Sequence, residues 1–424
     1  MLKNERGMIL PITLMILLLL TTVAVAVGSL ATSEPQIARN LADAARARAV
    51  AEAGLEVAYL QVANAASFSS LIASANGSGE VALATNATLP GLTAAQGGTY
   101  TVTVRNDTRN GDPVITGVAK ETSITADANN RLILVASGTF GNATRQVQVM
   151  VKKNVLPPTP GALNFPGNDA NTSFTDDSFQ VSGNDYTMAG GTGTCASVYG
   201  ITTGTTTNET LVQSSLTTAQ KDNVTGKKQV SSGTANGDNT IAQEATLTQA
   251  SITTFLKDAA RNADISLYSP SPGGLSFDNV STSNCTTNYA SQNCWGTAAK
   301  PKVVYVKGAP DPTSAFTALT LNGNITGYGV LIVEDGDLKV LGNFNWYGLV
   351  IVTGQWVGVG FMGSLNGTDQ YVYGSVISNE TSTDPLYEGV VYADAKLRYS
   401  CQALTNAAGS RKLLTMSSWT EVSQ

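Results

Sequence analysis

The sequence predicts an α+β protein: a long N-terminal helix, an antiparallel sheet, and a mostly β C-terminal domain that we expect to be a β-solenoid. Three observations support this fold class. Residues 8–33 carry no charge and lead into an Ala-rich segment, residues 99–151 contain strand-like apolar stretches, and a short pattern recurs within 324–352. A chain of 424 residues is too long for one compact unit, so we expect several domains.

The N-terminal segment predicts a membrane-spanning helix. Residues 1–7 form a short polar leader, and Ile9–Leu30 is almost wholly apolar, which is long enough to cross a bilayer. The basic residues of the leader should remain cytoplasmic. A plain membrane anchor or a secretory signal peptide is the alternative, but a signal peptide has an apolar core of only about 7–15 residues.

The same helix is expected to become amphipathic and to extend over residues 8–65. Gln36–Leu60 is rich in Ala, Leu, Arg and Glu, which are strong helix formers. A helix of this length would measure roughly 85 Å. Pro11 and Pro35 should kink or interrupt it because proline lacks the backbone donor.

An antiparallel sheet is predicted within residues 66–154. After a loop with a short helix near Phe68–Ala75, the segments Thr99–Arg105, Arg131–Ser137 and Arg145–Val151 are expected to be strands. The prolines of the next few residues favour extended chain and end the sheet. The predicted linker covers residues 155–161.

Residues 162–300 are rich in Asn, Thr, Ser and Gly, and we expect them to be irregular apart from one helix at Thr248–Asn262. Asp176 and Asp177 could contribute to a calcium site. No spaced Asp/Asn/Gly loop accompanies them, so a solvated turn is the preferred interpretation.

Residues 301–424 are expected to form the β-solenoid. Asn324–Val333 aligns with Asn343–Val352, an offset of 343 − 324 = 19 residues, and Tyr-Gly pairs recur, with Glu388–Tyr392 as a fourth similar mark. Repeats of about 20 residues with short strands and Gly turns indicate stacked rungs around one core. A meander of hairpins is the alternative, but the fixed order of two strand types favours the solenoid.

Two groups in this region could form a site. The first group, Glu334, Asp335 and Asp337, lies in a Glu-Asp-Gly-Asp sequence. We prefer to interpret this sequence as a turn. A calcium site is the second interpretation and a catalytic site is the third. The second group could form a sugar-stacking patch, although ordinary core aromatics are the preferred interpretation. Its members are Trp346, Tyr347, Trp356 and Phe361.

The composition excludes several classes of protein. The net charge is −6 and charged residues make up only 13%, which argues against a nucleic-acid partner. Histidine is absent, which removes the Ser-His-Asp triad, the Cys-His dyad and most zinc sites. These absences remove the commonest catalytic residues without excluding every enzyme, and we expect no catalytic residue, no metal and no cofactor.

The four cysteines are expected to form two disulfides, since an even number in a chain that looks exported is typical of disulfide bonding. Cys285 and Cys294 lie close together in a polar loop, and a local disulfide there should contribute about 2–3 kcal/mol. Cys195 and Cys401 would then pair by elimination.

A short basic leader ending in glycine, followed by an apolar helix that becomes amphipathic, resembles the type IV pilin superfamily. Arg6-Gly7-Met8 matches the place where prepilin peptidase cuts, and Arg6–Leu18 with Asn40–Asp43 and Ala51–Glu56 is most similar to PilX-type minor pilins. This resemblance covers about the first 60 residues. Near the C-terminus, residues 329–352 resemble bactofilin-like solenoids and a module often fused to PilX-type N-termini.

One residue departs from the pattern of the major pilins. If Met8 is the first mature residue, the fifth is Ile12, where most pilins carry Glu. PilX-like proteins and K-type pseudopilins often lack that Glu as well. The resemblance therefore makes Ile12, Pro11 and Pro35 the residues expected to govern packing in a filament.

The resemblance implies a non-enzymatic minor pilin or pseudopilin with a structural, priming or tip role. It implies a single-pass inner-membrane protein with a cytoplasmic N-terminus that later enters an extracellular pilus or pseudopilus. The implied partners are other minor and major pilins, prepilin peptidase, the pilus assembly platform and a PilY-type tip adhesin. A tip adhesin or carbohydrate-binding surface protein is the alternative function, and a polysaccharide-active enzyme is the third.

The first testable prediction is cleavage between Gly7 and Met8, with N-methylation of Met8 implied by the resemblance. The motivation is the polar leader and the continuous helix that follows it. Mass spectrometry of protein from piliated cells should find Met8 as the N-terminal residue. An intact Met1, or cleavage near Ala31, would contradict the prediction.

Overall fold

The computed structural model describes residues 9–63, 65, 67–230, 237–270, 273–309, 316–363, 369–383, 385–392 and 394–422. The chain divides into two compact units. The first unit comprises Met1–Val151 and Met416–Gln424, and the second unit comprises Lys152–Thr415. In chain order the second unit is therefore inserted within the first.

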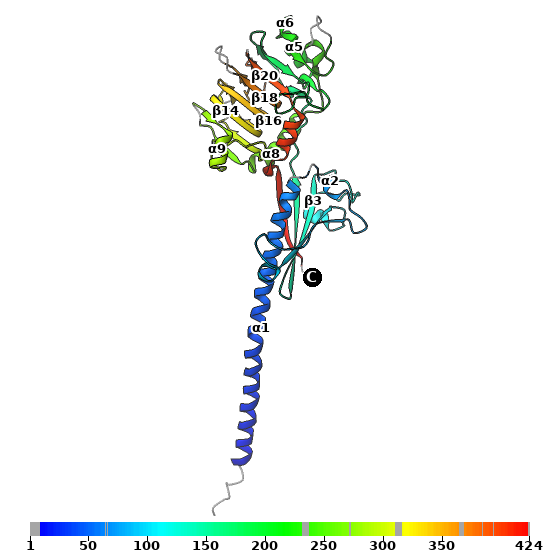
Figure 1. Ribbon diagram of the computed structural model, residues 1–424, viewed down its shortest axis with the longest axis vertical. Coiled ribbons are helices and arrows are strands. Elements are labelled where there is room, and N and C mark those ends of the chain that lie inside the picture. Colours follow the sequence, from blue (N-terminus) through cyan, green and yellow to red (C-terminus); the bar gives the residue numbers. More distant parts are fainter. Residues whose placement is uncertain are drawn as a thin grey trace, which may run out of the picture. The chain divides into compact units, whose positions relative to one another are not determined.

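One long helix, α1 (Ile9–Ala63), begins the first unit (Figure 1). Its bounds agree with the predicted range of 8–65, and neither Pro11 nor Pro35 interrupts it. Pro11 lies in the first turn, where backbone N–H groups have no helical partner in any case. Pro35 lies inside the helix, which continues through it, so the predicted interruption is absent there as well.

The two halves of α1 have different surroundings. The side chains of Leu10–Val27 are exposed, and this stretch is long and apolar enough to cross a membrane. The C-terminal half buries a stripe at helical spacing against the sheet. The stripe consists of Ala47, Val50, Ala51, Leu55, Ala58 and Val62.

The sheet of the first unit has five strands in the order β1-β2-β3-β4-β21. Its strands are β1 (Glu80–Ala87), β2 (Thr99–Asn106), β3 (Arg131–Phe140), β4 (Ala143–Lys153) and β21 (Leu414–Val422). The short helices are α2 (Phe68–Ile72), α3 (Ala94–Gly97) and α4 (Asp112–Thr116). The strands β1, β2 and β3 are antiparallel. The three predicted segments lie within β2, β3 and β4, whereas β1 lies in the stretch that was expected to be a loop.

The last strand, β21, differs from the prediction. The sequence assigned 301–424 to one solenoid domain, but Met416–Gln424 belong to the first unit, where β21 is the neighbour of β4. The strands β4 and β21 can be neighbours only because the second unit, which lies between them in the chain, brings its two ends together. A local sequence pattern cannot reveal this.

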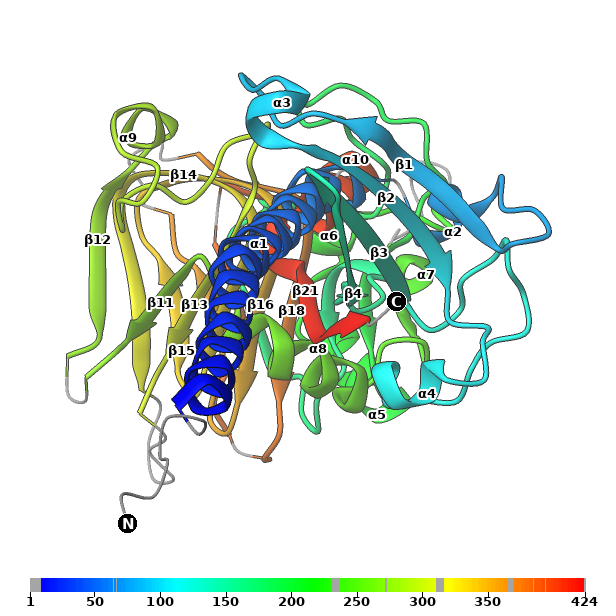
Figure 2. The same ribbon diagram turned by 90° about the horizontal axis from the view of Figure 1, so that it is seen from below.

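The second unit is a mostly β structure built on a curled sheet of parallel strands (Figure 2). Its strands are β5 (Gly161–Phe165), β6 (Thr172–Phe174), β7 (Gln180–Ser182), β8 (Tyr199–Thr203), β9 (Val224–Thr225), β10 (Ile241–Gln243), β11 (Ile265–Tyr268), β12 (Leu275–Val280), β13 (Lys302–Lys307), β14 (Thr317–Glu334), β15 (Asp337–Val340), β16 (Asn343–Gly354), β17 (Val359–Phe361), β18 (Gln370–Glu380), β19 (Gly389–Val391) and β20 (Ala395–Tyr399). Its helices are α5 (Thr206–Ser214), α6 (Thr218–Lys221), α7 (Gly237–Thr240), α8 (Gln249–Arg261), α9 (Thr282–Thr287), α10 (Cys401–Ala408) and the short 3₁₀ helix η2 (Arg411–Leu413).

The two copies of the sequence repeat are neighbouring parallel strands in the structure, paired at the same offset of 19 residues. Asn324 pairs with Asn343, and the parallel pairing continues without a shift to Glu334 and Thr353. The strand β18 continues the stack, with Tyr373 beside Tyr347. The expected fourth mark, Glu388–Tyr392, does not follow, because β19 pairs with β17 instead.

Residues 162–300 are not irregular as expected. The strands β5, β6 and β7 pair in parallel with β18, β19 and β20, so this region extends the same sheet. These strands contain only three to five residues each, which is too short for an alternation of apolar and polar residues to stand out in the sequence. The predicted helix is confirmed as α8, with Thr248 as its N-cap.

The core of the second unit lies within the curl of the sheet and includes Phe165, Trp295, Trp346 and Phe361. A second cluster covers part of the outer face, where α10 packs on β14, β16 and β18 and α8 packs beside β13. Both predicted disulfides are present, Cys285–Cys294 and Cys195–Cys401.

The parallel strands β14, β16 and β18 place equivalent residues beside one another, and we call each such row of residues a column. Glycine is required in one of these columns. Gly329, Gly348 and Gly374 have φ of 123°, 140° and 144°. A Cβ atom on Gly348 would lie 2.0 Å from the carbonyl oxygen of Gly329. The recurring Tyr-Gly pair therefore combines a stacked ring with a backbone position that excludes side chains.

We predict that Gly348→Ala destabilises the second unit by about 1–3 kcal/mol, because the added methyl group meets backbone that cannot move aside. Urea unfolding of the detergent-solubilised full chain measures the change. Gly191→Ala is the control, since its Cβ would make only an ordinary contact at 3.4 Å with Thr187. Equal stability of the two variants would show that the column tolerates a side chain.

Candidate functional site

The residues expected to govern processing and filament packing lie on or before α1. Gly7 and Met8 fall outside the described residues. Ile12 is 51% exposed, and Pro11 and Pro35 are exposed as well. Their roles remain predictions, because packing in a filament requires neighbouring subunits.

The four aromatic residues proposed from the sequence do not form one exposed patch. Trp346 and Phe361 are fully buried in the core. The ring of Tyr347 is stacked between Tyr328, with ring centroids 4.5 Å apart, and Tyr373, at 5.4 Å. Both faces of Tyr347 are therefore occupied, and only Trp356 remains for contact with a ligand.

The acidic residues proposed from the sequence also separate. Glu334 and Asp335 both pair with Lys307, and Asp335 adopts a φ of 57° in the turn before β15. Asp337 lies apart from this pair. Asp176 and Asp177 are exposed, with the Asp177 N–H donating to Asp176 Oδ1 at 2.6 Å, which agrees with a solvated turn.

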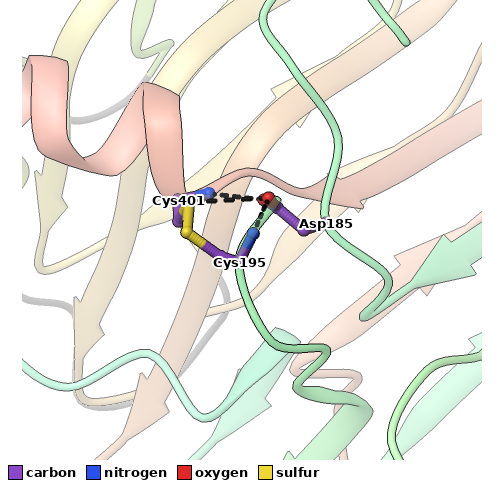
Figure 3. A group of neighbouring side chains, drawn as sticks. All are labelled: Asp185, Cys195 and Cys401. Atoms are coloured by element: carbon purple, nitrogen blue, oxygen red, sulfur yellow. Dashed lines mark hydrogen bonds between the residues drawn. A yellow bond between two sulfur atoms is a disulfide. The ribbon is translucent and has the colours of Figure 1, made fainter. Parts of the chain in front are cut away.

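Asp185 joins the two halves of the long-range disulfide (Figure 3). Its buried carboxylate accepts hydrogen bonds from the N–H of Cys195 at 2.8 Å and the N–H of Cys401 at 2.9 Å. The two sulfur atoms are bonded to one another. The group therefore offers no thiolate to a metal ion and acts as a structural clamp.

A cavity of about 160 Å³ in the second unit brings together one residue from each of the two proposed groups, Trp356 and Asp337. The described residues that line it are Asp337, Trp356, Val357, Glu380, Leu386, Tyr387, Glu388 and Val390. They include two aromatic rings and three carboxyl groups, and none of them is basic. The cavity is the best candidate for a ligand site in the described part of this unit.

A buried carboxylate fixes the turn that carries Trp356. Glu380 is 1% exposed, and its two oxygens accept the N–H groups of Trp356 at 2.8 Å and Val357 at 2.6 Å. Trp356 has a φ of 57°, a left-handed conformation that is rare for a bulky side chain. Such a residue persists only where its surroundings hold it, and positions of this kind cluster at ligand sites.

Glu388 lies in the wall of the same cavity and is 1% exposed. Its side chain accepts the N–H of Asn171, and its own N–H donates to the carbonyl oxygen of Asn171 at 2.9 Å. Burial, together with the negative charges of Asp169 and Glu380, raises the pKa of Glu388 to about 9. At neutral pH its carboxyl group therefore carries a proton.

Sequence reasoning missed Glu380, Tyr387 and Glu388. Glu380 ends β18 and Glu388 precedes β19, so both are acidic residues directly beside buried apolar strands. Strand-end position by itself gave no usable signal, because Glu334 also ends a buried strand and its side chain is 28% exposed.

Residues 6–56 match the family model described as PilX N-terminal. A search of curated proteins finds no match for the chain. Among solved structures, the competence-associated pilin ComZ from Thermus thermophilus is 14% identical, with a TM-score of 0.24; the match covers 90% of this chain and 97% of that chain. At this identity and score, that likeness alone establishes neither fold nor function. The matched N-terminal segment and the long apolar helix support a type IV pilin-like protein.

We predict that Glu388 makes the stability of the protein pH-dependent. The folded state holds the proton up to about pH 9, whereas the unfolded chain releases it above about pH 4.5. The free energy of unfolding should therefore decrease as the pH rises between these values, by at most about 1.4 kcal/mol per pH unit.

Glu388→Gln should remove this decrease and should be more stable than the natural chain at pH 8. Urea unfolding of the full chain between pH 5 and 9 tests both statements. Glu244→Gln, at a partly buried site in the same unit, controls for the loss of one acidic group. The same pH slope in Glu388→Gln and in the natural chain would refute the assignment.

Proposed function

We propose that the protein is a non-enzymatic minor pilin of a type IV pilus or a related secretion filament, and that it acts at the tip or in the priming complex. The observation that carries this proposal is α1. Its first half exposes apolar side chains from Leu10 to Val27, and its second half packs on an antiparallel sheet. The match of residues 6–56 to the PilX N-terminal model supports the same assignment.

Ile12 favours the tip. If Met8 is the first mature residue, its amine enters an apolar bundle of helices, and a buried amine is costly unless it is paired. In most pilins the Glu of an incoming subunit pairs with the amine of the subunit ahead of it. Ile12 cannot supply that carboxylate, so the chain is best placed where no subunit lies ahead.

The size of the second unit supports the same location. Lys152–Thr415 is larger than the whole first unit, and a domain of this size meets the least steric conflict at the end of a fibre. We also propose that its curled parallel sheet is a β-solenoid. The unshifted pairing of β14, β16 and β18 supports this, since stacked rungs repeat the same backbone positions.

The edge of the first sheet supports partnership with other pilins. The strand β21 lies at the end of the strand order, so one of its edges has no neighbour within the described chain. Met416 and Trp419 on this strand are 39% and 43% exposed and border a cavity of about 340 Å³. Exposed strand edges beside apolar surface are suited to protein contacts.

The location in the cell follows from the same assignment. We propose a single-pass inner-membrane protein with a cytoplasmic N-terminus that is later drawn into a filament, after cleavage by prepilin peptidase at Gly7. Contacts with the assembly platform and with a PilY-type adhesin are part of this proposal. A tip adhesin on the same scaffold is the second candidate function, and the cavity beside Trp356 is the observation that favours it.

We predict that immunogold labelling finds the natural protein at pilus tips. Ile12→Glu should shift part of the label onto the shaft, because the new carboxylate can pair with the amine of a subunit ahead. Ile12→Leu keeps the site apolar and should leave the label at the tips.

Two results would overturn the tip assignment. One is uniform labelling of the natural protein along the shaft. The other is normal pilus initiation after deletion of this protein together with any paralogues.

A further inference from the structure

We propose that Asp185 protects the exposed Cys195–Cys401 disulfide against reduction by thiols, so that the bond is a permanent crosslink and not a redox switch. The bond joins residues that are 206 positions apart, and it ties the loop that carries Cys195 to the start of α10 (Figure 3). This inference does not depend on the filament assignment, because it rests on the surroundings of one disulfide in the second unit.

The disulfide is open to attack at one of its sulfur atoms. Cys195 is exposed, whereas Cys401 is partly buried. A thiolate from solution therefore attacks Sγ of Cys195, the S–S bond breaks, and its electron pair leaves on Sγ of Cys401. A second thiolate then releases Cys195 from the mixed disulfide. Two thiols of the reductant become one disulfide, and the two cysteines gain two electrons and then two protons.

The position of Cys401 in α10 would by itself favour this reaction. Cys401 is the first residue of the helix, directly after the N-cap Ser400. The unpaired N–H groups and the dipole of a helix N-terminus stabilise a negative charge, so a cysteine there forms a thiolate readily. A thiol that ionises readily is a good leaving group. A disulfide that ends at this position is therefore easily reduced unless another group opposes the thiolate.

The carboxylate of Asp185 opposes it. Oδ1 of Asp185 accepts the N–H of Cys401 at 2.9 Å, and Oδ2 accepts the N–H of Cys195 at 2.8 Å. Oδ2 also lies 3.5 Å from Sγ of Cys401, where the negative charge of the leaving group would develop. Asp185 is 7% exposed, so water screens little of the repulsion between its carboxylate and that thiolate.

The charge of Asp185 also affects a second neighbour. Burial, and after it the charge of Asp185, raises the pKa of the Tyr399 phenol above its ordinary value. The carboxylate therefore disfavours the ionised form of the groups around it, which is the effect that the proposal requires at Cys401.

The loop is built around this carboxylate. The carbonyl oxygen of Asp185 accepts the N–H of Gly193 at 2.8 Å. A Cβ atom at position 193 would overlap with Oδ2 of Asp185, so glycine leaves the room that the carboxylate occupies. Because the backbones of both cysteines are held by one side chain, their sulfur atoms also stay aligned, and a broken bond would close again easily.

Reduction of the detergent-solubilised full chain by dithiothreitol tests the proposal. Timed alkylation and peptide mass spectrometry follow each disulfide separately. Asp185→Asn should speed reduction of Cys195–Cys401 by about threefold to tenfold, because the leaving thiolate no longer meets a negative charge. The Cys285–Cys294 disulfide is the internal control. Its cysteines are 7% and 0% exposed, so its rate should stay unchanged unless the unit unfolds.

A glycine pair tests the placement of the carboxylate. Gly193→Ala should displace Asp185 from the disulfide and speed reduction of Cys195–Cys401 as Asp185→Asn does. Gly191→Ala is the matched control in the same loop, since its Cβ atom would make only an ordinary contact with Thr187, and it should leave the rate unchanged.

A free thiol at Cys401 separates the effect of charge from a loosened loop. In Cys195→Ser, Cys401 is the one cysteine without a disulfide partner. Its rate of alkylation by iodoacetamide as a function of pH gives the midpoint of thiol ionisation. We expect a midpoint above about 8.5, the value of an ordinary cysteine, and a midpoint below about 8.5 after Asp185→Asn is added. A loosened loop alone would move the midpoint only toward the ordinary value.

Three results would overturn the proposal. Equal reduction rates of Cys195–Cys401 in the natural chain and in Asp185→Asn would show that the carboxylate does not protect the bond. Equal acceleration of both disulfides would show that Asp185 acts through the stability of the whole unit. A midpoint for Cys401 that is the same with and without the Asp185 carboxylate would show that its charge does not reach the sulfur.

Discussion

The second unit depends on a fixed backbone register between successive parallel strands. Because Asn324 lies beside Asn343 and Tyr347 lies beside Tyr373, each position along a strand has an equivalent position above and below it. A shift by one residue would turn every inward side chain outward. Buried Trp346 and the stacked Tyr347, which are adjacent in the chain, would exchange faces, and the core would be lost.

The register also explains the chemistry of the individual columns. The column with Gly348 has no room for a side chain, the neighbouring column stacks tyrosine rings, and the strand ends carry acidic residues. Glu380 ends β18 and uses both of its oxygens to hold the turn that follows the neighbouring strand β16. The cavity beside Trp356 thus arises where regular stacking gives way to turns, and burial at that point gives Glu388 its raised pKa.

The second unit is inserted into the first without separating the neighbouring strands β4 and β21. The two ends of the second unit are hydrogen-bonded to each other, since the Asn154 N–H donates to the Leu413 carbonyl oxygen at 2.7 Å. The chain can therefore leave the first sheet after β4 and return in β21 as that strand's neighbour. A scaffold of one helix and one sheet can carry a large domain in this way while α1 and four of the five strands stay together in the chain before the insertion.

The sequence by itself determined the features that depend on local patterns. These are the long helix with Ile12 in its apolar half, three strands of the first sheet, the helix α8 and the 19-residue register, each of which is visible as periodicity or repetition. The close spacing of Cys285 and Cys294 predicted the local disulfide, and Cys195–Cys401 followed only by elimination once that pair was assumed. Tertiary structure alone decided the position of β21, the strands within residues 162–300 and the cavity. Their partners lie far away in the chain, and burial of Glu380 and Glu388 results from a fold that no local pattern records.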